Sequence, residues 1–150
     1  MNQRWDLLVK NRDGDPILII EVKRQVNVSQ EWVMQLHRNL FSAAIFPKSS
    51  YFLIAFPDKF YLWVNTSKNK DEPDYTIDAK PLIQKYFEKT DTQPNQISGI
   101  SFEIIIASWL QEMIFSEELP EHIDREKSWL VESGLYQALR GSNIEYEAVA

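Results

Sequence analysis

The chain has 150 residues, of which 44% are apolar and 25% charged, and it contains no cysteine. A chain of this size and apolar content can bury one substantial core, so we expect a single domain over residues 1–150. The lack of cysteine excludes disulfides, thiol catalysis and cysteine-bound zinc. Because no apolar run reaches the roughly 20 residues of a membrane span and the N-terminus lacks the apolar core of a signal peptide, we expect a cytoplasmic protein without membrane contact.

The net charge of −6 argues against a general nucleic-acid coating protein, which would be basic. The charge is unevenly distributed along the chain. Residues 1–89 hold 13 Lys and Arg against 11 Asp and Glu, a balance of +2, whereas residues 90–150 hold 3 against 11, a balance of −8. A nucleic-acid surface is therefore expected in the first part of the chain, with these candidates: Lys10, Arg12, Arg24, Arg38, Lys48 and Lys59.

The first predicted unit is a β-hairpin. Residues 5–9 and 17–23 have strand patterns, and Asp13-Gly14 between them favours a two-residue type I′ turn. With that turn, the two residue numbers of every cross-strand pair add up to 27. Asp6 then lies opposite Glu21, with Cβ atoms roughly 4.5–5.5 Å apart. Lys23 follows two residues later on the same face of the strand. A slip of one residue would turn Asp6 to the other face.

Two carboxylates beside an ammonium group are what a metal-dependent phosphodiesterase needs, to hold Mg²⁺ and to balance charge on phosphate. Asp6 and then Glu21-Val22-Lys23 at the end of an apolar strand, followed by a helix, resemble the PD-(D/E)XK nuclease superfamily over about the first 65 residues. The chain also resembles short nuclease-like proteins of cyanobacteria. The alternative is an ordinary hairpin whose Glu21 and Lys23 pair with each other at a solvated strand end.

The resemblance implies a restriction-endonuclease-like fold of the α/β (α+β) class. We expect a mixed central sheet of about 4–5 strands flanked by helices, with the usual N-terminal helix and strand missing or replaced by C-terminal elements. It also implies that Asp6 and Glu21 bind Mg²⁺ or Mn²⁺ and that Lys23 positions water or stabilises the phosphate. Gln35, on the following helix, stands where many members place a helper residue.

The next elements complete a hairpin–helix–hairpin core over residues 1–65. Ser29 is a predicted N-cap for a helix through about Ser42, with Trp32, Leu36 and Leu40 as its apolar positions. Strands are predicted at 51–56 and 60–64, the first parallel to its neighbour because a long connection precedes it. Residues 66–74 are predicted to form an exposed loop.

A second pattern spells the superfamily consensus more literally. Pro57-Asp58 is followed by Asp78-Ala79-Lys80. We set it aside, because Asp58 falls in a predicted turn and Lys80 runs into a proline at a predicted helix start, so no adjacent central strands would aim these carboxylates together.

Residues 80–150 are predicted to be helical, with helices at 81–88, 97–115 and 126–139, and to end in a strand at 144–149 that joins a sheet edge. Glu103 falls on the apolar side of the second helix. One hypothesis makes Glu103 a third metal-binding acid; the other has it reach water or pair with an arginine. A set of aromatic residues covers the core or forms a homodimer interface: Trp109, Phe115, Trp129 and Tyr136.

The isolated His37 and His122 are predicted to be surface residues or hydrogen-bonded ones. The function predicted from the sequence is a Mg²⁺-dependent DNA endonuclease, with Asp6, Glu21, Lys23 and Gln35 in its active site. The alternative is a catalytically degenerate nuclease-fold protein that binds nucleic acid or another protein.

Overall fold

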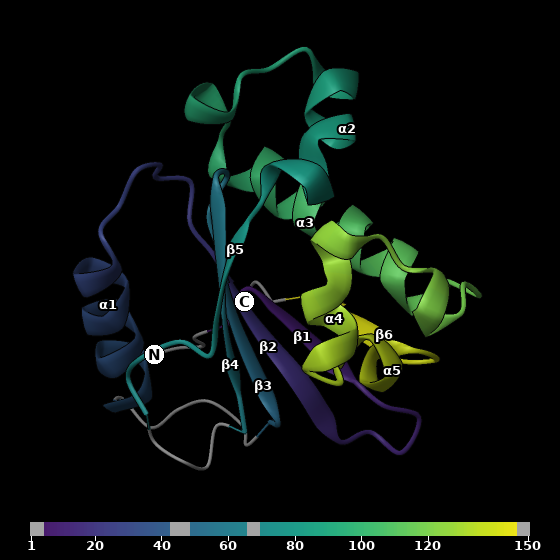
Figure 1. Ribbon diagram of the computed structural model, residues 1–150. Coiled ribbons are helices and arrows are strands. Elements are labelled where there is room, and N and C mark those ends of the chain that lie inside the picture. The colour runs from purple at the N-terminus through teal and green to yellow at the C-terminus, as the bar shows by residue number, and fades with distance from the viewer. Residues whose placement is uncertain (1–4, 43–48, 66–69, 147–150) are drawn as a thin grey trace.

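A computed structural model describes residues 5–42, 49–65 and 70–146, and it is an α+β structure with a mixed sheet of six strands flanked by helices (Figure 1). The sheet order is β5-β4-β3-β2-β1-β6, in which only β2 and β3 run parallel. The strand bounds are β1 Leu7–Lys10, β2 Pro16–Val22, β3 Tyr51–Ala55, β4 Lys59–Val64, β5 Tyr75–Asp78 and β6 Asn143–Tyr146. The sheet thus exceeds the 4–5 strands expected.

The first hairpin has the predicted register but not the predicted turn. Leu7 faces Ile20 and Val9 faces Leu18, so these pairs sum to 27. The type I′ turn is wrong: the Asn11 carbonyl accepts the Gly14 N–H, and Gly14 is the one turn residue with a positive φ. This longer loop alone would shift the register, and a bulge after Val9 shifts it back. Two deviations therefore cancel.

Helix α1, Gln30–Ser42, connects β2 to β3 and covers one face of the sheet, here called the α1 face (Figure 1). The Ser29 hydroxyl accepts the Trp32 N–H, as an N-cap does. The predicted apolar positions Leu36 and Leu40 pack against the sheet, but Trp32 is 43% exposed and Val33, which was not predicted, is fully buried in its place. The α1 face packs a small aromatic cluster around Phe52, Ile54, Phe56, Tyr61 and Trp63.

The other helices cover the opposite face and enclose the larger core (Figure 1). Their bounds are α2 Lys80–Thr90, α3 Gly99–Ile114, α4 Ser128–Glu132 and α5 Leu135–Leu139, with short 3₁₀ turns at Pro94–Gln96, Pro120–His122 and Arg125–Lys127. The single helix predicted at 126–139 is wrong. Gly134, at φ 83°, breaks it, and a Cβ there would lie 2.9 Å from the Tyr51 hydroxyl.

The aromatic residues of the C-terminal part pack mostly inward. Trp109, Trp129 and Tyr136 are buried in the larger core, whereas Phe115 is 73% exposed. Three of the four candidates for a dimer interface thus belong to the core of one chain. None of the helices in the described segments has the length and apolarity to cross a membrane.

The last strand joins the sheet edge beside β1, as predicted, although it spans Asn143–Tyr146 in the described chain. Strand β5 was missed because Tyr75–Asp78 is short and only Ile77 in it is buried, so the segment carries little apolar pattern. Pairing with β4 gives this segment its extended form.

Candidate functional site

The candidate site lies at the carboxyl end of β2, in the middle of the sheet. Glu21 alternates with Ile20 and Val22, which face the larger core, so its side chain lies on the α1 face. Glu21 is only 5% exposed, and the Lys23 Nζ lies 3.7 Å from its Oε2. The Lys23 N–H donates to the Ala55 carbonyl of the parallel strand, which fixes the backbone at this point.

Asp6 reaches the same place in a way that strand pairing does not describe. The ladder between β1 and β2 ends at Leu7 and Ile20, so Asp6 is not a ladder partner of Glu21 as predicted. Its carboxylate instead accepts the Val22 N–H at 2.7 Å. A side-chain oxygen thereby takes a position that a backbone carbonyl would fill if the strand continued.

The electrostatics of the site centre on Lys23. Burial raises the pKa of Asp6 above its ordinary value, and this effect outweighs the Val22 hydrogen bond and the charge of Lys23, which both lower it. The Lys23 ammonium therefore interacts electrostatically with both carboxylates while it remains partly exposed to solvent. Within residues 5–42, 49–65 and 70–146, Lys23 is an ion-pair partner of Glu21 and its charge also acts on Asp6, and a bound divalent cation would add further positive charge beside the two carboxylates.

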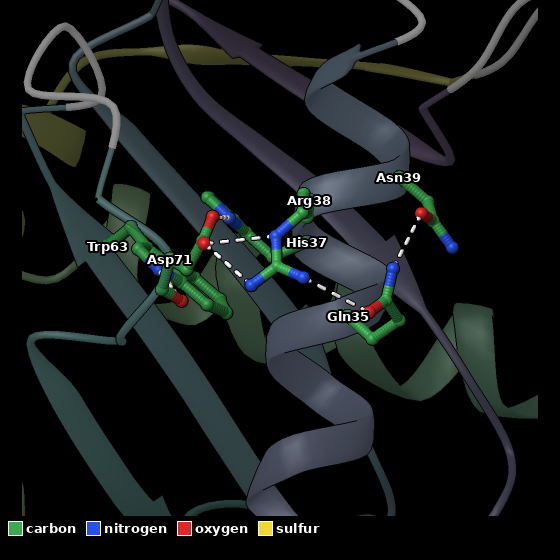
Figure 2. Close-up of polar contacts among 6 residues, drawn as sticks. All are labelled: Gln35, His37, Arg38, Asn39, Trp63 and Asp71. Carbon is green, nitrogen blue, oxygen red and sulfur yellow. Dashed lines mark hydrogen bonds and ion pairs between the residues drawn. The ribbon is translucent and has the colours of Figure 1, made fainter.

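Gln35 is not brought to this cluster (Figure 2). Its side-chain amide donates to Asn39 Oδ1 at 3.0 Å and accepts from Arg38 at 3.1 Å, on the exposed side of α1. Arg38 in turn donates twice to one oxygen of Asp71, at 3.0 and 2.8 Å. Asp71 follows β4, and the end of β4 pairs with the start of β3, so this network lies at the opposite end of the sheet from Lys23.

Glu103 does not join the site either. It lies on α3, whose buried residues pack against the face opposite to Glu21. There it lines a depression of about 350 Å³ together with Ile100, Ile104 and Tyr146. In the part of the chain that the structure describes, no group of three or more Asp, Glu, His or Cys residues is placed to hold a metal ion. The candidate cluster consists of Asp6, Glu21 and Lys23.

His37 was predicted to be a surface or hydrogen-bonded residue, and it does not lie at the surface. The imidazole is 4% exposed and stacks on Trp63 at 4.2 Å between ring centroids (Figure 2). It also contacts the rings of Phe41 and Phe52. Within the described residues its Nδ1 has no hydrogen-bond partner, and the nearest acid, Asp71, is 3.9 Å away. Desolvation lowers its pKa to about 4. The spacing Val33, His37, Phe41 was the sequence signal for this position.

The pattern that was set aside does come together. Asp78 pairs with Lys59 in the ladder between β4 and β5, and the Ala79 N–H donates to the Asp58 carbonyl at 3.1 Å. Asp58, Asp78 and Lys80 line one cavity. Strand β5, which was not predicted, gives Asp78 a paired neighbour in β4, but β5 is an edge strand and Asp58 lies in the turn before β4, so the two acids do not stand on adjacent central strands.

The basic residues do not form one surface around the candidate site. Arg24 and Lys59 are exposed at its end of the sheet, but Lys10 and Arg12 lie at the hairpin end, where Lys10 pairs with Glu145 at 2.9 Å. Arg38 binds Asp71, as described above. Lys48 lies outside the described residues.

Comparison with protein families, curated proteins and solved structures gives no match to this chain. The candidate site therefore rests on its own residues and their geometry.

Proposed function

We propose that this protein is a divalent-metal-dependent nuclease, of restriction-endonuclease-like fold, that hydrolyses phosphodiester bonds in DNA. The observation that carries the proposal is the buried Glu21 at the end of a central strand, with Lys23 3.7 Å away and the Asp6 carboxylate bound to the intervening Val22 N–H. Burial of a glutamate beside a second acid is unfavourable unless cations offset the charge. Such an arrangement is typical of a site selected for chemistry rather than stability.

The donor set fits Mg²⁺ or Mn²⁺. Both ions prefer carboxylate oxygens, and Mg²⁺ in nucleic-acid enzymes is held by one or two carboxylates together with water and substrate phosphate. Asp6 and Glu21 would supply these carboxylates, so a third acid is not required. A bound ion would polarise the phosphate and lower the pKa of a water molecule.

The protein residues have separate roles in this proposal. Lys23, with its Nζ partly exposed, offers positive charge to a phosphate oxygen, and this charge counts most as the attacking water adds to phosphorus and the bond to the leaving sugar oxygen breaks. The Val22 N–H fixes the orientation of the Asp6 carboxylate. Gln35 has no part in this site, because its amide is bound to Arg38 and Asn39.

The test measures metal binding and DNA cleavage together. Calorimetry with Mn²⁺ should show binding to the wild-type chain, and Glu21→Gln, which keeps the shape of the side chain, should abolish it. Cleavage of a labelled DNA duplex should require Mg²⁺ or Mn²⁺ and should fall by about 100-fold or more in Glu21→Gln and in Lys23→Met.

The controls use residues of the same type away from the site. Glu31→Gln changes an exposed acid on α1, and Lys89→Met an exposed lysine on α2; both should leave cleavage unchanged. Absence of Mn²⁺ binding in the wild type, or cleavage that survives Lys23→Met, would overturn the proposal. The first of these results would favour the alternative from the sequence, a catalytically degenerate nuclease-fold protein that binds nucleic acid or another protein.

A further inference from the structure

The loop that leaves the candidate site is fastened to the neighbouring turn of the sheet. This β2–α1 loop, residues 23–29, begins at Lys23. Because β2 and β3 are parallel, the loop and the turn between β3 and β4 lie at the same end of the sheet. The Lys23 N–H donates to the Ala55 carbonyl at 2.9 Å, and the Asn27 N–H donates to Asp58 Oδ2 at 3.0 Å. The loop is thus held near its start and near its end.

Asp58 is itself held in place by backbone hydrogen bonds. Its carbonyl accepts the Ala79 N–H at 3.1 Å, which ties it to the end of β5, and the Phe56 N–H closes the turn by donating to the Lys59 carbonyl at 2.8 Å. On the other side of the link, Asn27 has φ 58°, a left-handed conformation that asparagine tolerates and that turns the chain before α1 begins. Loss of the Asp58 carboxylate would remove the acceptor of the Asn27 N–H and release the loop at this point.

The held segment carries an exposed cation. Residues 24–26 lie between the two anchored positions, and Arg24 is exposed. Arg24 forms no ion pair with another described residue, whereas Lys10 and Arg38, which were also predicted for a nucleic-acid surface, are each paired with an acid. Arg24 directly follows Lys23, the cation of the candidate site. Its charge is therefore available to an anionic partner beside that site.

The phosphate backbone of DNA has the chemistry that such an arginine recognises. A guanidinium group keeps its charge and can donate two parallel hydrogen bonds to one phosphate. Contacts of this kind fix the position of a protein on the duplex without reading its sequence. They are strongest when the backbone that carries the arginine is already ordered, because less conformational entropy is lost on binding. The hydrogen bond from Asn27 to Asp58 supplies this order in the free protein.

We propose that Arg24 binds a DNA backbone phosphate next to the one that is cleaved, and that Asp58 is a positioning residue that holds the β2–α1 loop for this contact. The inference rests on the proposed function, since it takes DNA as the substrate. Asp58 acts through the Asn27 N–H and does not touch DNA. Lys23 is held separately by the Ala55 carbonyl, so loss of the Asp58 carboxylate should weaken DNA binding and leave Mn²⁺ binding unchanged.

The contact is tested by fluorescence anisotropy of a labelled DNA duplex with the full chain, in EDTA and at about 50 to 200 mM NaCl. Arg24→Met should weaken DNA binding about tenfold at the lowest salt concentration. It should also reduce the steepness of the salt dependence of log Kd by about 1, as the loss of one phosphate contact does. Arg125→Met, at an exposed arginine of the C-terminal part, is the matched control and should change neither quantity. No DNA binding by the wild type, or an unchanged salt dependence in Arg24→Met, would overturn the proposal.

The positioning role is tested by two variants of Asp58. Asp58→Ala and Asp58→Asn both remove the negative charge, but asparagine keeps an oxygen for the Asn27 N–H. Asp58→Ala should weaken DNA binding about as much as Arg24→Met, and Asp58→Asn should bind at least as tightly as the wild type. Arg24→Met/Asp58→Ala should bind no more weakly than Arg24→Met alone, because Asp58 acts through the loop that carries Arg24. Additive losses, or equal affinity of the two Asp58 variants, would overturn the positioning role.

The outcomes separate this inference from the nuclease proposal, because DNA binding is measured without metal and without cleavage. A wild-type chain that binds DNA through Arg24 but neither binds Mn²⁺ nor cleaves would support the phosphate contact and overturn the nuclease proposal. Cleavage that requires Glu21 and Lys23, together with wild-type affinity and salt dependence in Arg24→Met, would overturn the phosphate contact alone. Arg24→Met changes an exposed loop position, so it tests the contact even where Asp58→Ala does not fold.

Discussion

The two faces of the sheet have different chemistry. The face covered by α2 to α5 packs a large aliphatic and aromatic core, with Trp109, Tyr136 and Phe102 among its largest buried side chains. The α1 face packs a much smaller cluster, yet the buried carboxylate of Glu21 and the buried imidazole of His37 both lie on it. Hydrophobic stabilisation scales with buried apolar area, so the larger face supplies most of the stability.

The difference teaches that stability and chemistry are divided between the faces. A buried Glu or His costs free energy, and such a cost is tolerated where a function needs the group or where the remaining core compensates. A single helix over the α1 face leaves the end of β2 open enough for Lys23 to be partly exposed. Variants on the two faces should therefore respond differently to pH, and four of them test this, from the largest expected effect to the smallest.

Phe102→Ala, on the larger face, should destabilise the fold by about 3–5 kcal/mol, because Phe102 is fully buried in α3 and its removal leaves a cavity. The loss measured by chemical denaturation should be the same at pH 5 and pH 7, since no ionisable group is altered. A loss below about 1 kcal/mol would contradict the assignment of stability to this face.

His37→Phe should change the pH dependence of stability. The folded pKa of His37 is lowered to about 4 from an ordinary value of 6.5, so the unfolded chain takes up the proton first as pH falls. Wild-type stability should thus fall by about 3 kcal/mol between pH 6.5 and 4 from this residue alone. His37→Phe should lack this loss, and His122→Gln, an exposed control, should retain it. An equal loss of folding stability between pH 6.5 and 4 in the wild type and in His37→Phe would contradict the prediction.

Asp6→Leu should destabilise the chain by about 1–2 kcal/mol at neutral pH, because the Val22 N–H loses its acceptor. Asp6→Asn keeps an acceptor oxygen and removes the titration. Because the pKa of Asp6 is raised in the fold, wild-type stability should fall as pH rises from 3.8 through the folded pKa, and Asp6→Asn should lack this fall. Addition of Mg²⁺ should stabilise the wild type at pH 7 but not Asp6→Asn; equal stabilisation of both would argue against Asp6 as a metal ligand.

Arg38→Ala should have the smallest effect, below about 1 kcal/mol, because its pair with Asp71 is exposed on both sides. DNA cleavage should remain unchanged, as this network lies away from Lys23. The stability difference between Arg38→Ala and the wild type is measured by thermal unfolding at low and at high salt. A loss of cleavage in Arg38→Ala would contradict the separation of this network from the site.

Local patterns in the sequence predicted much of the first half of the fold. The apolar run of β2, the N-cap at Ser29 and the apolar strands β3 and β4 are properties of neighbouring residues, and the structure bears them out. Strand β5 and the break at Gly134 were missed, because a weakly patterned strand depends on its partner β4, and Gly134 meets the Tyr51 hydroxyl, which is distant in sequence.

The sequence by itself determined which residues carry charge at the end of an apolar strand, and so it pointed to Asp6, Glu21 and Lys23. Only the tertiary structure decided that Asp6 binds the Val22 N–H rather than facing Glu21 in a ladder, and that Gln35 and Glu103 lie elsewhere. It also brought Asp58 and Asp78 into one cavity. The physical reason is that side-chain type is local, whereas proximity depends on bulges, turns and packing summed over the whole chain.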